Sequence, residues 1–210
     1  MIVAIDGPAG AGKSTVARTL ASRLGFRYLD TGAMYRALTQ LALDEGVPLD
    51  DGAALGDLAR REPVSFEGDR VFIQGEDVTE EIREPRIDRV VSSVARHRGV
   101  REVMRERQRQ LGAQGDSVIE GRDIGEIVAP DAEVKVWLYA DPAVRAARRQ
   151  AERHGIEAAE LADEMRRRDE RDAVNTHQAS DAVEVDTTDL TLEEVVDRIE
   201  SLVHQRVARA

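Results

Sequence analysis

The sequence predicts an α/β fold in which a five-stranded parallel sheet is flanked by helices. The first observation behind this prediction is a series of short apolar runs of strand type, separated by stretches with apolar residues at helical spacing. The second is a glycine-rich loop that follows the first run and precedes a helix. The five strand-like runs are residues 1–5, 26–29, 118–123, 134–138 and 182–185.

The glycine-rich loop matches the phosphate-binding pattern G-x-x-x-x-G-K-S/T in full, in the order strand, loop and helix. The N–H groups of the loop and of the first helical turn lack partners within the helix, so they can converge on an anion. The pattern predicts that Lys13 reaches the β- and γ-phosphates of a nucleoside triphosphate and that the Ser14 hydroxyl holds Mg²⁺. The residues expected to contact the phosphates are Gly7, Pro8, Ala9, Gly10, Ala11, Gly12, Lys13, Ser14 and Thr15.

The composition narrows the class of protein. With 41% hydrophobic residues the chain can build the core of one compact domain, and without cysteine it forms neither disulfides nor thiolate metal sites. A net charge of −11 argues against binding of nucleic acid through the whole surface. No apolar run approaches the length that spans a membrane, and no signal peptide precedes the first strand. We therefore expect a soluble, cytoplasmic monomer without a membrane or nucleic-acid partner.

The region between the second and third strands departs from the alternation of strand and helix. Within residues 50–85, the runs 64–66 and 70–73 flank a turn that contains glycine, which predicts a small antiparallel hairpin. A helical stretch over 85–110 follows and is interrupted near 97–99, where glycine is a poor helix former. Other helices are expected over 33–45 with Asp30 or Thr31 as its cap, from Asp141-Pro142 to 153, and over 192–207.

Polar side chains gather at predicted strand ends and helix starts, where open α/β sheets bind ligands. Arginines among them suit phosphoryl transfer, which needs positive charge on the transferring oxygens and two substrates held in line. Taken alone, however, Arg101, Arg105 and Arg109 recur every fourth residue and equally fit a solvated helix face. The four groups are Asp30, Thr31, Tyr35 and Arg36; Ser92 and Arg101; Arg122 and Asp123; and Arg168, Arg171 and Asp172.

Four motifs together resemble the bacterial cytidylate kinases. They are I-D-G-P-A-G-A-G-K-S at 5–14, Y-L-D-T-G-A-M-Y-R at 28–36, E-G-R-D-I-G at 120–125 and R-D-E-R-D at 168–172, and G-E-D-V-T-E-E-I-R at 75–83 agrees with them. The similarity runs through essentially the whole chain in the same order. It implies the P-loop kinase fold of nucleoside monophosphate kinases, with transfer of a phosphoryl group from ATP, in the presence of Mg²⁺, to CMP or dCMP.

The resemblance also implies how the chain is divided and what its residues do. The core would comprise residues 1–29, 116–153 and 176–210, with an acceptor-binding region at 30–115 and a lid at 154–175 that closes over the transferring phosphoryl group. The catalytic residues implied are Lys13, Arg122 and Arg168. The acceptor contacts implied are Thr31, Arg101 and Asp123 at the cytosine ring, Arg36 and Arg122 at the phosphate, Ser92, Arg168 and Asp172 around the sugar, and Tyr35 beside the pocket.

The base contacts make chemical sense, because an aspartate acceptor beside an arginine donor matches the amine and N3 edge of cytosine. Uracil would instead place a carbonyl against Asp123, which pairs two acceptors. The chain departs from the family pattern at Asn175, where the family has an arginine near the sugar–phosphate end of the acceptor. Two alternatives remain open on the residues alone: a P-loop kinase for UMP, AMP or shikimate, and an ATP-binding module without an acceptor.

Overall fold

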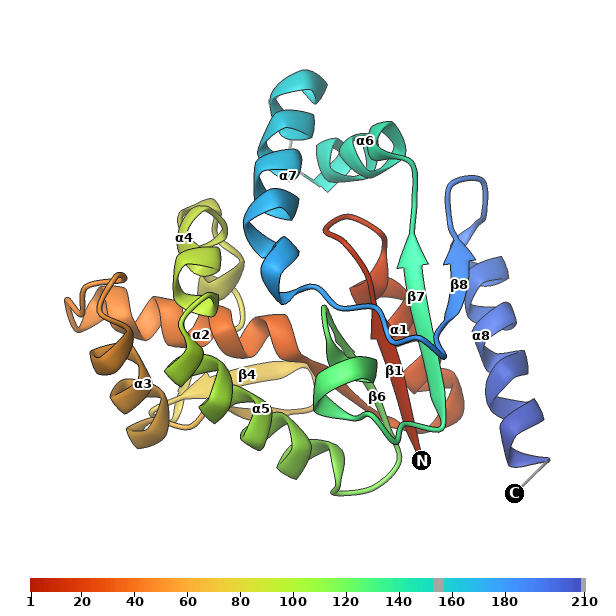
Figure 1. The fold of residues 1–210 in the computed structure, drawn as a ribbon, viewed down its shortest axis with the longest axis horizontal. Coiled ribbons are helices and arrows are strands. Elements are labelled where there is room, and N and C mark those ends of the chain that lie inside the picture. The colour runs from red at the N-terminus through yellow and green to blue at the C-terminus, as the bar shows by residue number, and fades with distance from the viewer. Residues whose placement is uncertain (153–156, 209–210) are drawn as a thin grey trace. The chain divides into compact units, whose positions relative to one another are not determined.

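The computed structural model describes residues 1–152 and 157–208 (Figure 1). The chain separates into two compact units. The phosphate-loop unit comprises Met1–Leu29 and Gly115–Ala210, and the insertion unit comprises Asp30–Gln114. Among the described residues, no helix combines the length and the apolar character needed to cross a membrane.

The phosphate-loop unit is built on the predicted five-stranded parallel sheet, which the structure confirms. The strands lie in the order β2-β6-β1-β7-β8, and β1 pairs in parallel with both β6 and β7. Asp6, the last residue of β1, lies opposite Gly121 of β6 and Trp137 of β7, so these three strands end at one edge. The strands are β1 (Ile2–Asp6), β2 (Arg27–Asp30), β6 (Ser117–Gly121), β7 (Val134–Tyr139) and β8 (Val183–Asp186).

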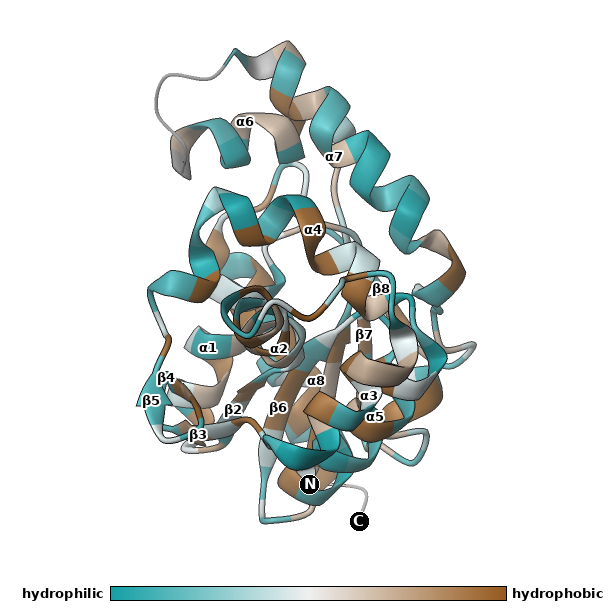
Figure 2. Ribbon diagram, turned by 90° about the vertical axis from the view of Figure 1, so that its left-hand side faces the viewer, coloured by the Kyte–Doolittle hydropathy of each residue, from teal (hydrophilic) through white to brown (hydrophobic). Residues whose placement is uncertain are grey.

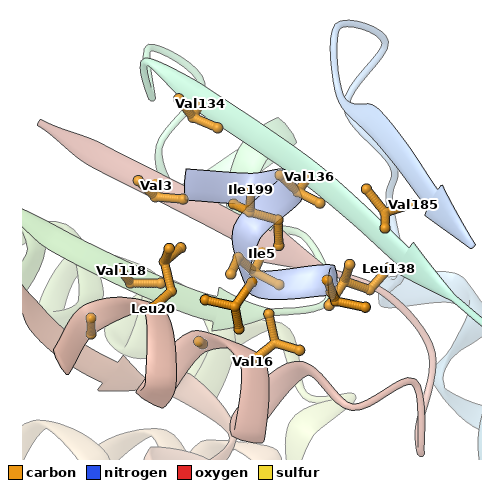
Figure 3. Packing of buried hydrophobic residues seen from close by; sticks show 14 of the residues in the cluster. Val3, Ile5, Val16, Leu20, Val118, Val134, Val136, Leu138, Val185 and Ile199 are labelled. Carbon is orange, nitrogen blue, oxygen red and sulfur yellow. The ribbon is translucent and has the colours of Figure 1, made fainter. Parts of the chain in front are cut away.

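Two helices pack on the same face of this sheet. In α1 (Lys13–Leu24) the apolar residues face the strands, and in α8 (Leu192–Val207) they join the same buried cluster (Figure 3). Val16 and Leu20 of α1 and Ile199 of α8 are at most 3% exposed. The start of α8 is fixed by a capping box, in which Thr191 and Glu194 satisfy each other's backbone N–H groups.

Two further helices lie on the chain between β7 and β8. The helix α6 (Pro142–Glu152) begins at Pro142 as predicted, and Asp141 accepts the Ala143 N–H at 2.8 Å. The helix α7 (Ala158–Asp172) is hydrophilic along most of its length (Figure 2), but its Leu161 and Met165 side chains are buried. Of the predicted lid, residues 154–156 lie outside the described part of the chain, and most of the remainder is α7, followed by the 3-10 turn η3 (Ala173–Asn175).

The insertion unit combines four helices with the small antiparallel sheet expected from the sequence. The predicted hairpin is confirmed, and β5 adds a third strand to it. The predicted break near 97–99 separates α4 from α5. The helix α3 was not expected, because residues 50–63 were predicted only as part of an irregular insertion. The elements are α2 (Thr31–Asp44), α3 (Gly52–Arg61), β3 (Ser65–Glu67), β4 (Arg70–Ile73), β5 (Glu76–Asp77), η1 (Glu81–Arg83), α4 (Pro85–Ala95) and α5 (Arg98–Gly112).

Candidate active site

The phosphate-binding loop leaves β1 at Asp6 and enters α1 at Lys13. A Cβ atom on Gly7 would lie 2.0 Å from the Leu138 carbonyl oxygen, so only glycine fits where the loop passes the end of β7. Gly12 has a φ of 89°, and no side chain caps the first turn of α1, which also lacks acidic residues. The N–H groups of this turn therefore remain free to bind an anion.

Lys13 is held inside the loop rather than in solvent. Its Nζ atom donates a hydrogen bond to the Pro8 carbonyl oxygen at 2.8 Å. Burial first, and the nearby Arg122 guanidinium second, lower the pKa of Lys13 from 10.5 to about 7, while the Glu120 carboxylate acts in the opposite direction. A phosphate bound in the loop would raise this pKa again, because it adds negative charge beside a desolvated ammonium group.

Two buried carboxylates support the loop from the ends of β1 and β6. Asp6 accepts the backbone N–H groups of Ile124 at 2.9 Å and Gly125 at 2.8 Å, which fixes the π-helical turn η2 (Ile124–Val128) just after Asp123. Burial is the main reason that the pKa of Asp6 rises from 3.8 to about 6. Glu120, 3% exposed, accepts the Ser14 hydroxyl at 3.0 Å and also the Tyr28 hydroxyl.

The Ser14 contact bears on the predicted metal site. Because its proton points to Glu120, the lone pairs of the Ser14 oxygen remain available to a cation. Among the described residues, no group of three or more His, Asp or Glu side chains is arranged to hold a metal ion. This donor set fits Mg²⁺, which proteins commonly hold through one or two side chains together with water and the phosphates of a substrate.

Two of the three predicted arginines of this unit, Arg122 and Arg168, lie together, whereas Arg171 is exposed and donates to the Arg167 carbonyl oxygen at 3.1 Å. Arg122 forms an ion pair with Asp172 at 3.0 Å, and Arg168 lies 3.7 Å from the same carboxylate. Asp123, the neighbour of Arg122, is 6% exposed. The structure thus brings Arg122, Arg168 and Asp172 into one cluster, although Arg122 directly follows β6 and is far in the sequence from the two residues of α7.

Two residues that were not predicted complete this cluster. Arg145 of α6 donates to the Ala9 carbonyl oxygen at 2.9 Å and to Asp169 of α7 at 2.6 Å. Asp169 also accepts the Ala9 N–H at 3.3 Å and lies 3.8 Å from Arg122. Asp169 lies within the R-D-E-R-D motif at 168–172, next to the predicted Arg168, whereas Arg145 is not close in sequence to any predicted site residue, and no spacing signal joins α6 to the loop.

The insertion unit gathers the other predicted side chains. Arg36 forms an ion pair with the buried Asp88 at 2.6 Å, a partner that was not predicted. Arg101 is buried, and its guanidinium lies over the Tyr35 ring, 5.9 Å from the ring centroid. Arg109 is exposed and therefore fits the alternative reading of a solvated helix face, whereas Arg101, which is buried, does not.

Two hydroxyl side chains of this unit are also buried. Thr31, at the start of α2, is 4% exposed, and the helix cap is Asp30, whose carboxylate accepts the Ala33 N–H at 2.9 Å. Ser92 of α4 is 8% exposed, and its Oγ atom has no hydrogen-bond partner within the described structure. A buried hydroxyl without a partner carries an energetic cost that a bound ligand could relieve.

A complete phosphate-binding loop, a lysine hydrogen-bonded to the backbone of that loop and an arginine cluster at the carboxyl edge of a parallel sheet together define a P-loop phosphotransferase. Solved structures agree on the fold. A shikimate kinase from Bacteroides thetaiotaomicron is 17% identical, with a TM-score of 0.51 over 97% of this chain and 98% of that one. An uncharacterized protein from Eubacterium ventriosum gives a TM-score of 0.54 at 16% identity, covering 97% of this chain and 98% of that one.

Sequence comparison identifies the family within this class. The family model described as cytidylate kinase matches residues 3–205. A cytidylate kinase of Geobacillus sp. (strain WCH70) is 49% identical over 98% of this chain and 97% of its own length. That of Bacillus subtilis (strain 168) is 46% identical over 97% of this chain and 96% of its own length. The chain belongs to the cytidylate kinase family, which confirms the resemblance drawn from its motifs.

Proposed function

We propose that this chain transfers the γ-phosphoryl group of ATP to CMP or dCMP, producing CDP or dCDP and ADP. The observation that carries the proposal is the cluster at the edge of the parallel sheet. There a complete phosphate loop, with Lys13 hydrogen-bonded to its backbone, lies beside Arg122, Arg168 and Asp172. Membership of the cytidylate kinase family supports CMP and dCMP as the acceptors.

On the donor side, the loop residues from Gly7 to Thr15 would hold the phosphates of ATP through their N–H groups. Lys13 would contact the β- and γ-phosphates. Mg²⁺ would be held by the Ser14 hydroxyl and would supply positive charge that neutralises the phosphates of ATP. Glu120 supports this role because it accepts a hydrogen bond from the Ser14 hydroxyl and so orients the hydroxyl oxygen.

On the acceptor side, the base would be recognised by Thr31, Arg101 and Asp123. Burial supports this assignment, because all three side chains are less than 9% exposed and their polar atoms are shielded from water. Arg36 and Arg122 would hold the acceptor phosphate, each already aligned by an ion pair with an aspartate. The residues proposed around the sugar and pocket are Tyr35, Ser92, Arg168 and Asp172.

For this reaction the protein must mainly hold the two substrates in line and supply positive charge at the transferring phosphoryl group. An oxygen of the CMP phosphate attacks the γ-phosphorus, the bond from that phosphorus to the bridging oxygen breaks, and ADP departs with the electron pair. The attacking phosphate is already anionic, so no side chain needs to remove a proton. Lys13, Arg122 and Arg168 would stabilise the negative charge on the transferring group. We further propose that residues 154–175 act as the lid, that residues 30–115 bind the acceptor, and that the enzyme works as a monomer.

The test is an acceptor panel with Mg·ATP, in which ADP production is measured with CMP, dCMP, UMP, AMP and shikimate. We expect fast turnover with CMP and dCMP only. Faster turnover with another acceptor would contradict the base assignment and leave a P-loop kinase of different specificity. If the protein still binds ATP but no acceptor increases ADP production, the phosphotransferase proposal itself would be contradicted.

A further inference from the structure

The carboxylate of Asp169 lies on the phosphate-binding loop. One oxygen accepts the Ala9 N–H at 3.3 Å, and the other accepts a hydrogen bond from Arg145 at 2.6 Å. The same Arg145 nitrogen donates to the Ala9 carbonyl oxygen at 2.9 Å, so α6, α7 and the loop meet at a single residue. Arg122 lies 3.8 Å from the Asp169 carboxylate.

Apolar contact accompanies these polar ones. A Cβ atom on Gly10 would lie 2.5 Å from the Met165 Cε atom and 3.2 Å from the Arg145 Cβ atom, so the loop backbone packs directly against α6 and α7. Met165 and Leu161 are the buried apolar residues of α7. Asp169 is therefore held at the loop by its helix, and its side chain is 25% exposed.

The groups around Asp169 are those that bind a phosphate oxygen. A loop N–H and the guanidinium groups of Arg145 and Arg122 would serve a phosphate as well as a carboxylate, and they would hold it through charge-assisted hydrogen bonds. Another acidic residue of the same helix differs: Glu170 pairs with Arg166 at 2.8 Å, and both side chains are about 60% exposed. The position of Asp169 thus cannot be attributed simply to the acidic character of α7.

We propose that Asp169 is a positioning residue that stands in for a phosphate of the donor in the nucleotide-free chain. Its carboxylate occupies the Ala9 N–H and holds Arg145 and Arg122 beside the loop. An incoming triphosphate competes for the same donors, and Asp169 leaves the loop when the triphosphate binds. This inference rests on the proposed function only in taking the loop as a phosphate site.

A competing internal anion lowers the apparent affinity for an external one, because the loop is open to the ligand for only part of the time. Removing the negative charge of Asp169 should therefore strengthen anion binding. The first variant is Asp169→Asn, which keeps the shape of the side chain. The matched control is Glu170→Gln, which removes the same charge from the same helix without touching the loop.

The probe is inorganic triphosphate without metal or acceptor, titrated by calorimetry. We expect Asp169→Asn to bind it about 3- to 10-fold more tightly than the wild-type chain, and Glu170→Gln to differ from wild type by less than about 2-fold. Equal affinities of the two variants, or weaker binding by Asp169→Asn, would overturn the proposal. Wild-type protein that fails to bind triphosphate at all would instead contradict the phosphate-loop assignment.

Hydrogen exchange gives a second readout that a merely structural role would not produce. Without ligand, the Ala9 amide should exchange faster in Asp169→Asn than in wild type or in Glu170→Gln, while amides within α7 keep their protection. Equal exchange rates of the Ala9 amide in Asp169→Asn and wild type would show that Asp169 does not protect this N–H group and would overturn the proposal. If amides of α7 lose protection in Asp169→Asn, the triphosphate titration and the exchange of the Ala9 amide are repeated with Asp169→Ala. Tighter binding and faster exchange at Ala9 would then support the proposal, and their absence would overturn it.

Discussion

Asp6 should make the stability of the fold depend on pH in a defined direction. Its side chain is 4% exposed, and burial raises its pKa from 3.8 to about 6. Between these values the folded chain holds a proton that the unfolded chain has released. The stabilisation is therefore fully present below pH 3.8 and is lost as the pH rises through about 6.

The size of the effect follows from the same two values. At about 1.4 kcal/mol per pH unit, the difference between 3.8 and about 6 corresponds to roughly 3 kcal/mol. Asp6→Asn removes this titration. The free energy of unfolding of the wild-type chain, minus that of Asp6→Asn, should then fall by roughly 2–3 kcal/mol between pH 4 and pH 7, since part of the titration lies below pH 4.

Urea denaturation of both proteins at closely spaced pH values measures this difference, and the other carboxylates cancel in the subtraction. Asp57→Asn is a suitable control, because it removes a carboxylate whose side chain is 72% exposed on α3, so its difference from wild type should stay nearly flat. A wild-type minus Asp6→Asn difference that is constant from pH 4 to 7, or that grows with pH, would refute the reasoning. Either result would mean that burial does not dominate the environment of Asp6.

Three further substitutions test the roles of single side chains. Lys13→Ala should lower turnover by at least about 100-fold while the circular dichroism spectrum is unchanged, since charge stabilisation is lost at the transferring phosphoryl group; a near-normal rate would remove the loop from the chemistry. Asp123→Asn should reduce the preference for CMP over UMP in kcat/KM by about 10-fold or more. An unchanged ratio would rule out Asp123 as the residue that reads the base. Ser92→Ala should raise the KM for CMP several-fold and should raise the free energy of unfolding by about 1 kcal/mol, because it removes a buried hydroxyl that has no hydrogen-bond partner within the described residues. Loss of stability with an unchanged KM would contradict a role in acceptor binding.

The parts of the fold that depend on local signals could be predicted from the sequence. The phosphate loop requires glycine where Gly7 passes the Leu138 carbonyl, and Gly7 is the first glycine of the phosphate-binding motif. The turn of the hairpin contains Gly68, which has a φ of 59°. The break between α4 and α5 falls at residues 96–97, and Gly99, the residue on which its prediction rested, lies inside α5. The helix α3 was missed because Gly52 and Gly56 lower its helix propensity, although its cap, Asp51, accepts the N–H groups of Ala53 and Ala54.

The partners of the site residues could not be predicted in the same way. Arg36 was identified, but its pairing with the buried Asp88 depends on how α2 and α4 pack. Likewise the contact between Asp169 and Ala9 joins residues 160 positions apart, and no local pattern encodes it. The sequence gives a weaker indication of the roles of Glu120 and Asp6. Each is a carboxylate in, or at the end of, an otherwise apolar strand, and a carboxylate buried there requires hydrogen-bond donors nearby.

The γ-phosphoryl group should pass from ATP to the phosphate of CMP. The most direct test uses ATP that carries a radioactive label in its γ-phosphate, incubated with the protein, Mg²⁺ and CMP, followed by separation of the products. This transfer should place the label in the terminal phosphate of CDP, should form unlabelled ADP in equal amount, and should be mostly abolished by Lys13→Ala. Label released as inorganic phosphate, or retained in ATP while CMP stays unchanged, would contradict it.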